Sequence, residues 1–151
     1  MNKIKSSFAP RRKLPDWLKT SLPKGASYFR LKALVEKYGL NTVCESASCP
    51  NIGDCWSAGT LTLMILGDTC TRSCRFCDVP TGSMKPPRME EPTEIAEMLS
   101  KINLKYIVIT SVDRDDLPDG GSAIWAQTIH QVKKKNPSMN VEALIPDFKG
   151  E

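Results

Sequence analysis

Six cysteines carry the most distinctive chemistry of this 151-residue chain, and they fall into two groups of three. The downstream group has the spacing C-x3-C-x2-C and consists of Cys70, Cys74 and Cys77. Three thiolates on a short loop can hold three corners of an iron–sulfur cube, which leaves the fourth iron open for chemistry. A zinc site is the alternative, but zinc takes four ligands. The fourth would have to be a cysteine of the other group or the only histidine, His130. His130 falls in the middle of a predicted helix, where we expect it to be exposed.

The upstream group has the spacing C-x4-C-x5-C and consists of Cys44, Cys49 and Cys55. Taken alone, it fits a structural zinc ion or an electron-relay cluster as well as any other metal centre. Disulfides are disfavoured for three reasons. The chain shows no export signal, and groups of three cysteines cannot pair completely among themselves. The predicted core is also of a kind that needs no disulfides for stability. The cysteines therefore favour metal-bound thiolates in a reducing cytosol.

The elements that must position the downstream cysteines form a strand–helix alternation. An apolar run predicts a strand over 62–66, and the cysteines follow it directly. Sites in α/β folds are built where parallel strands end. The segment YIVIT is almost wholly apolar, as expected for a parallel strand buried on both faces. The pattern predicts strands over 62–66, 106–110 and 141–145 and helices over 92–102 and 122–135.

The first part of the chain has a different character. Residues 1–27 are rich in Pro, Lys and Arg, and we interpret them as an extended arm lying on the body through Trp17 and Leu18. A helix is predicted over 28–38, with Gly39 as its C-terminal cap. The segment 44–55 reads as a loop, and Trp56 would shield the site that this loop closes. We place a boundary between residues 1–59 and residues 60–151.

Composition limits the class of protein. The chain is 40% hydrophobic and 25% charged with a net charge of +4, which is ordinary for a soluble globular protein. No apolar run of about 18 residues predicts a transmembrane helix. The basic residues near the N-terminus suit either contact with nucleic acid or a membrane, or a solvated flexible arm. We favour the arm and expect no nucleic acid, no membrane and a cytoplasmic location.

Several motifs resemble a known family. The C-x3-C-x2-C spacing with an aromatic residue, Phe76, before the last cysteine resembles the radical S-adenosylmethionine (SAM) superfamily. Both triplets, on either side of TLTLMILGDTCTR, resemble the lipoyl synthase family in particular. So do ITSVDRDDLPDGG and VEALIPDFKG, and the resemblance runs from about Leu14 to the last residue.

The resemblance implies two 4Fe-4S clusters. Cys70, Cys74 and Cys77 would hold the cluster that binds SAM and, once reduced, cleaves it to methionine and a 5′-deoxyadenosyl radical. The triplet of Cys44, Cys49 and Cys55 would hold an auxiliary cluster that is consumed as the sulfur donor. The implied activity is a sulfurtransferase of lipoate biosynthesis, which inserts sulfur at C6 and C8 of a protein-bound octanoyl group.

The resemblance also implies partners and SAM contacts. The expected partners are an octanoylated lipoyl carrier domain (glycine cleavage H protein or a 2-oxoacid dehydrogenase E2 domain) and an electron donor such as flavodoxin or ferredoxin. Ser111 and Asp113 follow the second strand, where the superfamily binds the SAM amino group, although DRDDLPDGG also fits a solvated turn. Phe76 would pack on the adenine side of SAM or, alternatively, in the core.

The predicted fold is α/β, the N-terminal half of a partial (β/α) TIM-type barrel with three parallel strands. A complete barrel needs about 250 residues, and the family continues with further βα units and a C-terminal serine that completes the auxiliary ligation. No residue here matches that serine, so we expect the chain to be inactive alone. The inner strand faces, including Ile107, Ile109 and Leu144, should lose part of their cover. The alternative functions are a non-enzymatic iron–sulfur electron-transfer module and a zinc-dependent binding module.

Overall fold

The computed structural model describes residues 15, 16, 19, 22–102 and 104–150. The predicted contacts of Trp17 and Leu18 lie outside these residues. In chain order the elements are α1 (Ala26–Lys37), β1 (Asn41–Thr42), α2 (Val43–Ser46), α3 (Ile52–Ser57), β2 (Thr62–Ile65), α4 (Glu91–Ser100), β3 (Tyr106–Ser111), α5 (Ser122–Lys135), β4 (Asn140–Leu144) and the 3-10 turn η2 (Phe148–Gly150).

One sheet organises the fold, with the strand order β1-β2-β3-β4. The strands β2, β3 and β4 are parallel, as the sequence predicts, and each follows the previous one by a crossover through α4 or α5. The sheet differs from the prediction at its other edge, because the two-residue strand β1 pairs antiparallel with β2. A strand that short carries no periodic signal in the sequence.

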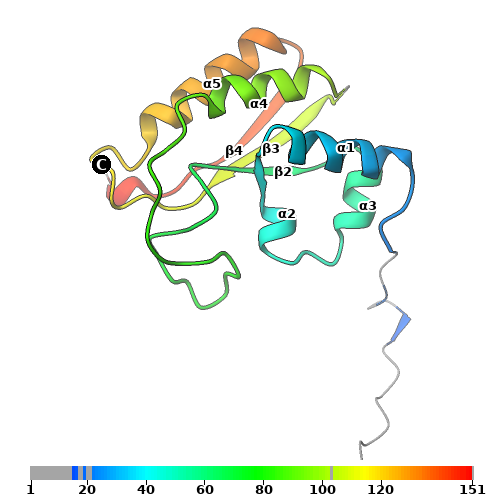
Figure 1. Ribbon diagram of the computed structural model, residues 1–151, viewed down its shortest axis with the longest axis horizontal. Coiled ribbons are helices and arrows are strands. Elements are labelled where there is room, and N and C mark those ends of the chain that lie inside the picture. Colours follow the sequence, from blue (N-terminus) through cyan, green and yellow to red (C-terminus); the bar gives the residue numbers. More distant parts are fainter. Residues whose placement is uncertain (1–14, 17–18, 20–21, 103, 151) are drawn as a thin grey trace, which may run out of the picture.

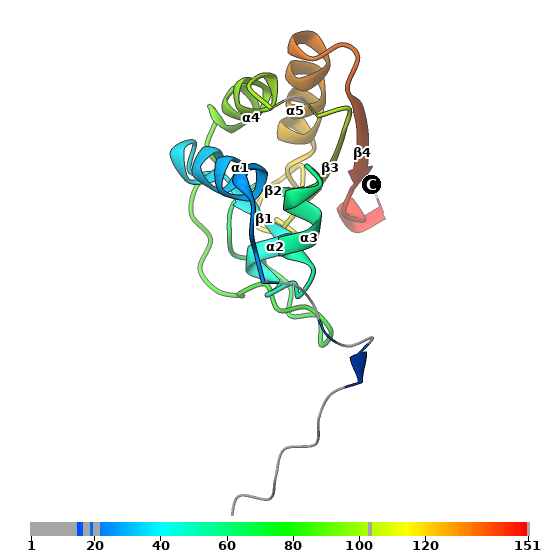
Figure 2. The same cartoon turned by 90° about the vertical axis from the view of Figure 1, so that its right-hand side faces the viewer.

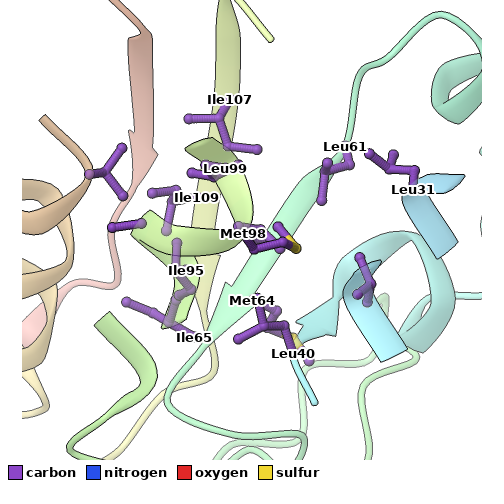
Figure 3. Packing of buried hydrophobic residues seen from close by; sticks show 14 of the residues in the cluster. Leu31, Leu40, Leu61, Met64, Ile65, Ile95, Met98, Leu99, Ile107 and Ile109 are labelled. Carbon is purple, nitrogen blue, oxygen red and sulfur yellow. The ribbon is translucent and has the colours of Figure 1, made fainter. Parts of the chain in front are cut away.

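Helices α4 and α5 cover one face of the sheet (Figure 1). Pro92 lies in the first turn of α4, where its missing N–H costs nothing. Figure 3 shows the side chains of Ile95 and Leu99 from α4 beside Ile107 and Ile109 from β3. Both β3 isoleucines are 0% exposed. The prediction that Ile107 and Ile109 lie on an uncovered inner face is therefore wrong, because these positions face the helix layer.

The opposite face of the sheet is less well covered. In the register of β3 and β4, Val108 pairs with Glu142 and Thr110 pairs with Leu144, so these residues share the face turned away from α4 and α5. Leu144 is 50% exposed, which agrees with the prediction made for it. Figures 1 and 2 show α2, α3 and the long connection after β2 on this side of the sheet.

The segment before β2 is helical rather than a loop. Helix α1 ends as predicted, because Gly39 adopts a φ of 57° and donates its N–H to the carbonyl of Glu36. The predicted loop over 44–55 is wrong, since α2 and α3 occupy much of it. At α2 the physical reason is a side-chain N-cap, in which Thr42 Oγ1 accepts the N–H of Glu45 at 3.2 Å. Within the described residues, none of the helices is long and apolar enough to span a membrane.

Candidate metal centre

The downstream cysteines lie on a loop, residues 67–81, that we call the cysteine loop. It is preceded by Leu66, which directly follows β2 and adopts a left-handed φ of 71° that leucine rarely takes. The Glu91 carboxylate accepts the N–H of Leu66 at 2.9 Å, and the Arg114 guanidinium donates to the carbonyl of Leu66 at 3.0 Å. Both charged side chains are buried, so the root of the loop is held from two sides inside the protein.

The base of the cysteine loop is closed by backbone pairing. Cys70 donates its N–H to the carbonyl of Pro80 at 2.8 Å and forms an isolated bridge with Thr81. The backbone N–H and the hydroxyl of Thr71 both reach the carbonyl of Asp113, at 3.1 and 2.9 Å. The loop base is therefore fixed against the segment that follows β3.

The sulfur of Cys70 accepts two backbone hydrogen bonds. Its Sγ accepts the backbone N–H of Arg72 at 3.4 Å and that of Asp113 at 3.3 Å. Backbone N–H donors aimed at a cysteine sulfur tune the potential of a bound iron–sulfur cluster. Cys70 thus has the surroundings expected of a cluster ligand.

The tip of the cysteine loop is open to solvent. Cys74 and Cys77 are both exposed and joined by a turn in which Cys77 donates its N–H to the Cys74 carbonyl at 3.0 Å. Phe76 between them is 95% exposed, so the alternative that placed it in the core is wrong. The prediction that Phe76 packs against adenine is not tested by this arrangement.

The other two predicted SAM contacts lie near the same loop. Ser111, the last residue of β3, accepts the indole N–H of Trp125 at 3.0 Å. One carboxylate oxygen of Asp113 lies 3.9 Å from Cys70 Sγ, and the other lies 3.6 Å from Nη1 of Arg72. The structure thus brings Asp113 directly beside a predicted cluster ligand, whereas contact of either residue with SAM stays a prediction.

The upstream cysteines are brought together by the two short helices. Cys44 lies on α2, Cys55 lies on α3, and Cys49 lies in the turn between them, donating its N–H to the Cys44 carbonyl at 3.0 Å. Burial raises the pKa of the Cys55 thiol, and the neighbouring Cys44 and Cys49 raise it further. Both cysteines therefore lie near enough to Cys55 to affect its charge.

Trp56, next to Cys55, is fully buried, and its ring lies 5.5 Å from that of Tyr28. Its indole N–H has no hydrogen-bond partner among the described residues. The expected role in shielding a site is not tested by this packing.

Sequence reasoning missed a third group of charges around the cysteine loop. Arg72 forms ion pairs with Asp115, after β3, and with Asp147, after β4, both at 2.8 Å. Arg72 lowers the pKa of the Asp115 carboxyl to about 2 and also holds that of Asp147 below its usual range. The only signal in the sequence is an arginine between two ligand cysteines and carboxylates shortly after two strands.

Arg72 and Asp115 border a cavity of about 440 Å³ at the carboxyl ends of β3 and β4. Its lining also includes Asp113, Phe148 and Lys149. The cavity therefore joins the base of the cysteine loop to the ends of two parallel strands, which is where α/β folds place their ligands.

The chemistry of the donor set fits iron–sulfur clusters. All six cysteines are free thiols, and His130 is exposed on α5. Among the described residues, no three His, Cys, Asp or Glu side chains already converge as a metal site. A cluster on Cys70 would thus require the exposed thiols of Cys74 and Cys77 to move toward Cys70. The tip of the cysteine loop is open to solvent, which leaves room for that movement.

Comparison with known proteins places this geometry in a family. The chain belongs to the radical SAM superfamily, whose family model matches residues 64–148. Residues 1–49 match the model described as the N-terminal domain of lipoyl synthase of the radical SAM family. The sheet and the cysteine loop thus match the superfamily, whereas the segment before them matches the lipoyl synthase model.

Curated relatives carry the same particular likeness along nearly the whole chain. The chain is 52% identical to a mitochondrial lipoyl synthase of Nematostella vectensis over 95% of its own length and 49% of the relative. It is 54% identical to a lipoyl synthase of Flavobacterium johnsoniae over 90% of its length and 47% of that protein. The chain is 53% identical to a lipoyl synthase of Thermus thermophilus over 93% of its own length and 44% of that protein. The chain spans about half the length of these relatives.

Proposed function

We propose that this protein is a radical SAM enzyme of the lipoyl synthase type, which inserts sulfur at C6 and C8 of a protein-bound octanoyl group. The observation that carries the proposal is the cysteine loop after β2, in a chain 52% identical to a lipoyl synthase. The two N–H donors on Cys70 Sγ support it, because they suit a cluster ligand.

Each cysteine triplet has a separate role in this proposal. Cys70, Cys74 and Cys77 would hold a 4Fe-4S cluster, which when bound supplies the electron that cleaves SAM. The upstream triplet, whose members lie on α2, on α3 and in the turn between them, would hold the auxiliary 4Fe-4S cluster that provides sulfur. The family's fourth auxiliary ligand, a serine, has no counterpart in residues 1–151.

Residues after β3 would bind and orient SAM. Ser111 uses its oxygen to accept from Trp125, so its own hydroxyl proton is available to a carboxylate of the ligand. The Asp113 carboxylate can accept from an ammonium group beside Cys70. Phe76 would move with the loop tip to cover adenine and exclude water from it.

The remaining parts of the proposal concern partners and place. The substrate would be presented by an octanoylated lipoyl carrier domain, and a flavodoxin or ferredoxin would supply electrons. Free thiolates that must stay reduced suit a cytoplasmic location. We further propose that residues 1–151 alone make no lipoyl product, which the exposed Leu144 and Ile145 at the open side of β4 support.

The test separates the two triplets in a protein extended to the length of the relatives. After anaerobic reconstitution, iron and acid-labile sulfide are measured first, since their absence would favour a zinc module. Cys74→Ala should abolish SAM cleavage, whereas Cys49→Ala should still cleave SAM but form no lipoyl group. Full cleavage by the Cys74 variant, or undiminished lipoyl formation by the Cys49 variant, would contradict the assignment. SAM cleavage also distinguishes the enzyme from an electron-transfer module.

A further inference from the structure

Arg72 lies between two of the predicted cluster ligands, yet its side chain turns back toward the sheet. Its Nε and Nη2 donate to the two carboxylate oxygens of Asp115, both at 2.8 Å. Its Nη1 and Nη2 also donate to the carboxylate of Asp147, at 3.0 and 2.8 Å. One guanidinium therefore ties the cysteine loop to the segments after β3 and β4 at the same time.

We call the bonds from Arg72 to Asp115 and Asp147 the anchor. Further bonds make Asp115 its centre. Its backbone N–H reaches Thr71 Oγ1 at 3.1 Å, and its carbonyl accepts from Lys149 Nζ at 3.0 Å. Paired N–H···O bonds to a carboxylate require the planar fork of arginine, which lysine lacks. Because Thr71 also binds Asp113, the anchor lies next to the backbone N–H that Asp113 donates to Cys70 Sγ.

A second arginine on the same loop provides a contrast. Arg75 lies beside Cys74, is exposed, and has no hydrogen bond or ion pair with any described residue. The two arginines carry the same charge and lie at similar separations in sequence from the ligand cysteines. Of the two, only Arg72 has side-chain partners in the segments after β3 and β4. Comparing the two positions therefore separates the effect of anchoring from the effect of charge.

We propose that Arg72 is a positioning residue that fixes the base of the cysteine loop, and with it Cys70, against the ends of β3 and β4. Its consequence for a bound cluster rests on the function proposed above. The anchoring itself does not, because it concerns the loop of the chain without any bound group.

The first test measures hydrogen exchange of the Cys70 and Thr71 amides by NMR in the metal-free chain. Losing a charge-assisted bond pair in Arg72→Gln should speed this exchange about tenfold or more relative to wild type. Arg75→Gln, which removes the same charge, should change it less than about twofold, and Arg72→Lys should fall between. Exchange in the amides of α5 serves as a control for global unfolding. Equal protection in the Arg72→Gln and Arg75→Gln variants would overturn the proposal.

The second test examines the cluster in the reconstituted protein. Electron paramagnetic resonance of the reduced sample is recorded with and without SAM at matched iron content. The SAM-induced change should be altered in Arg72→Gln, altered less in Arg72→Lys, and retained in Arg75→Gln. Similar spectra for all variants would show that the anchor does not position the cluster. If wild-type protein binds no cluster, the proposed function fails, whereas the exchange experiment still decides the anchoring.

Discussion

The two cysteine triplets are supported in opposite ways. Cys44 and Cys55 lie on α2 and α3, whose own backbone bonds and the Thr42 cap hold them over a short stretch of chain. Cys74 and Cys77 are exposed on a loop without regular structure. That loop is held at its base, by its own closing pair and by residues that are distant in the sequence.

The difference lies in the range of the supporting contacts. The bonds from Arg72 span 43 residues to Asp115 and 75 residues to Asp147, whereas the cap of α2 spans three. Local contacts form without the sheet, but long-range ones exist only when β2, β3 and β4 are in register. The reactivity of Cys70 should therefore change when the sheet is disturbed. The reactivity of the upstream cysteines should change only when α2 or α3 is disturbed.

The largest expected effect concerns the root of the cysteine loop. In Gly121→Ala the new Cβ would lie 2.5 Å from Cδ1 of the buried Leu66, and residue 121 would keep a φ of 88°. Overpacking and left-handed strain together should cost about 2–4 kcal/mol, measured by urea unfolding. Alkylation of Cys70 should accelerate while that of Cys55 stays unchanged.

Gly25→Ala is the matched control for this variant, because its φ is 95° but nothing lies within 4 Å of the new Cβ. It should cost only the backbone strain, about 1–2 kcal/mol. If both variants lose the same free energy of unfolding, the close packing of Gly121 against Leu66 does not contribute to stability beyond the backbone strain.

A smaller effect is expected at the upstream triplet. Thr42→Ala removes the side-chain cap of α2 and should cost about 1 kcal/mol. Alkylation of Cys44 and Cys49 should accelerate without a change at Cys70. Thr42→Ser retains the hydroxyl and serves as the control, so a Ser variant as labile as the Ala variant would argue against the cap.

Glu91→Gln sharpens the comparison at the loop root. Burial raises the pKa of the Glu91 carboxyl, and the N–H of Leu66 offsets only part of this. A raised pKa means that the stability contributed by Glu91 is present at low pH and is lost as the pH rises through its folded value. Gln keeps the acceptor without the buried charge, so it should stabilise the protein by up to about 1 kcal/mol at neutral pH.

The gain from Glu91→Gln should vanish below about pH 4, where Glu91 is protonated in both states. Melting temperatures at pH 7 and pH 4 provide the measurement. Glu91→Ala removes the acceptor as well and should destabilise at both values. A Gln variant less stable than wild type at pH 7 would show that the charge of Glu91 is needed beside Arg114.

The smallest effect is the acid response of the loop base. The pKa of Asp115 is lowered from 3.8 to about 2, chiefly by its bonds from Arg72. Its contribution is therefore present above the ordinary carboxyl pKa and is lost as the pH falls toward 2. The ¹³C shift of the Asp115 carboxyl should titrate near 2 in wild type and near its ordinary value in Arg72→Gln. Identical titrations would contradict the ion pair.

Local patterns predict much of the fold. The bounds of β2, β3, β4 and α5 agree with the sequence to within one residue at each end, because apolar runs and helical periods are local signals. The face on which Ile107 lies was predicted wrongly for a physical reason. YIVIT is apolar on both faces, so its pattern cannot say which face the helices cover.

The site is predictable only where it is local. The spacing of the cysteines reveals both triplets, and Thr42 followed three residues later by Glu45 is a local signal for the start of α2. The partners of Arg72 have no such signal, because Asp115 and Asp147 come near it only through the sheet. Likewise, the sequence does not reveal that Phe76 is exposed at the loop tip.

The pairing of Cys70 with Thr81 has a consequence for insertions and deletions. Because the cysteine loop is closed at its own base, extra residues after Cys77 lengthen only its outer part. Each doubling of a flexible loop's length costs about 0.6 kcal/mol of closure entropy. Residues added between Leu66 and Cys70 would instead shift Cys70 away from Asp113. Natural length variation, and affinity tags or reporter peptides placed by design, should therefore be tolerated around Asp78 and rejected before Cys70.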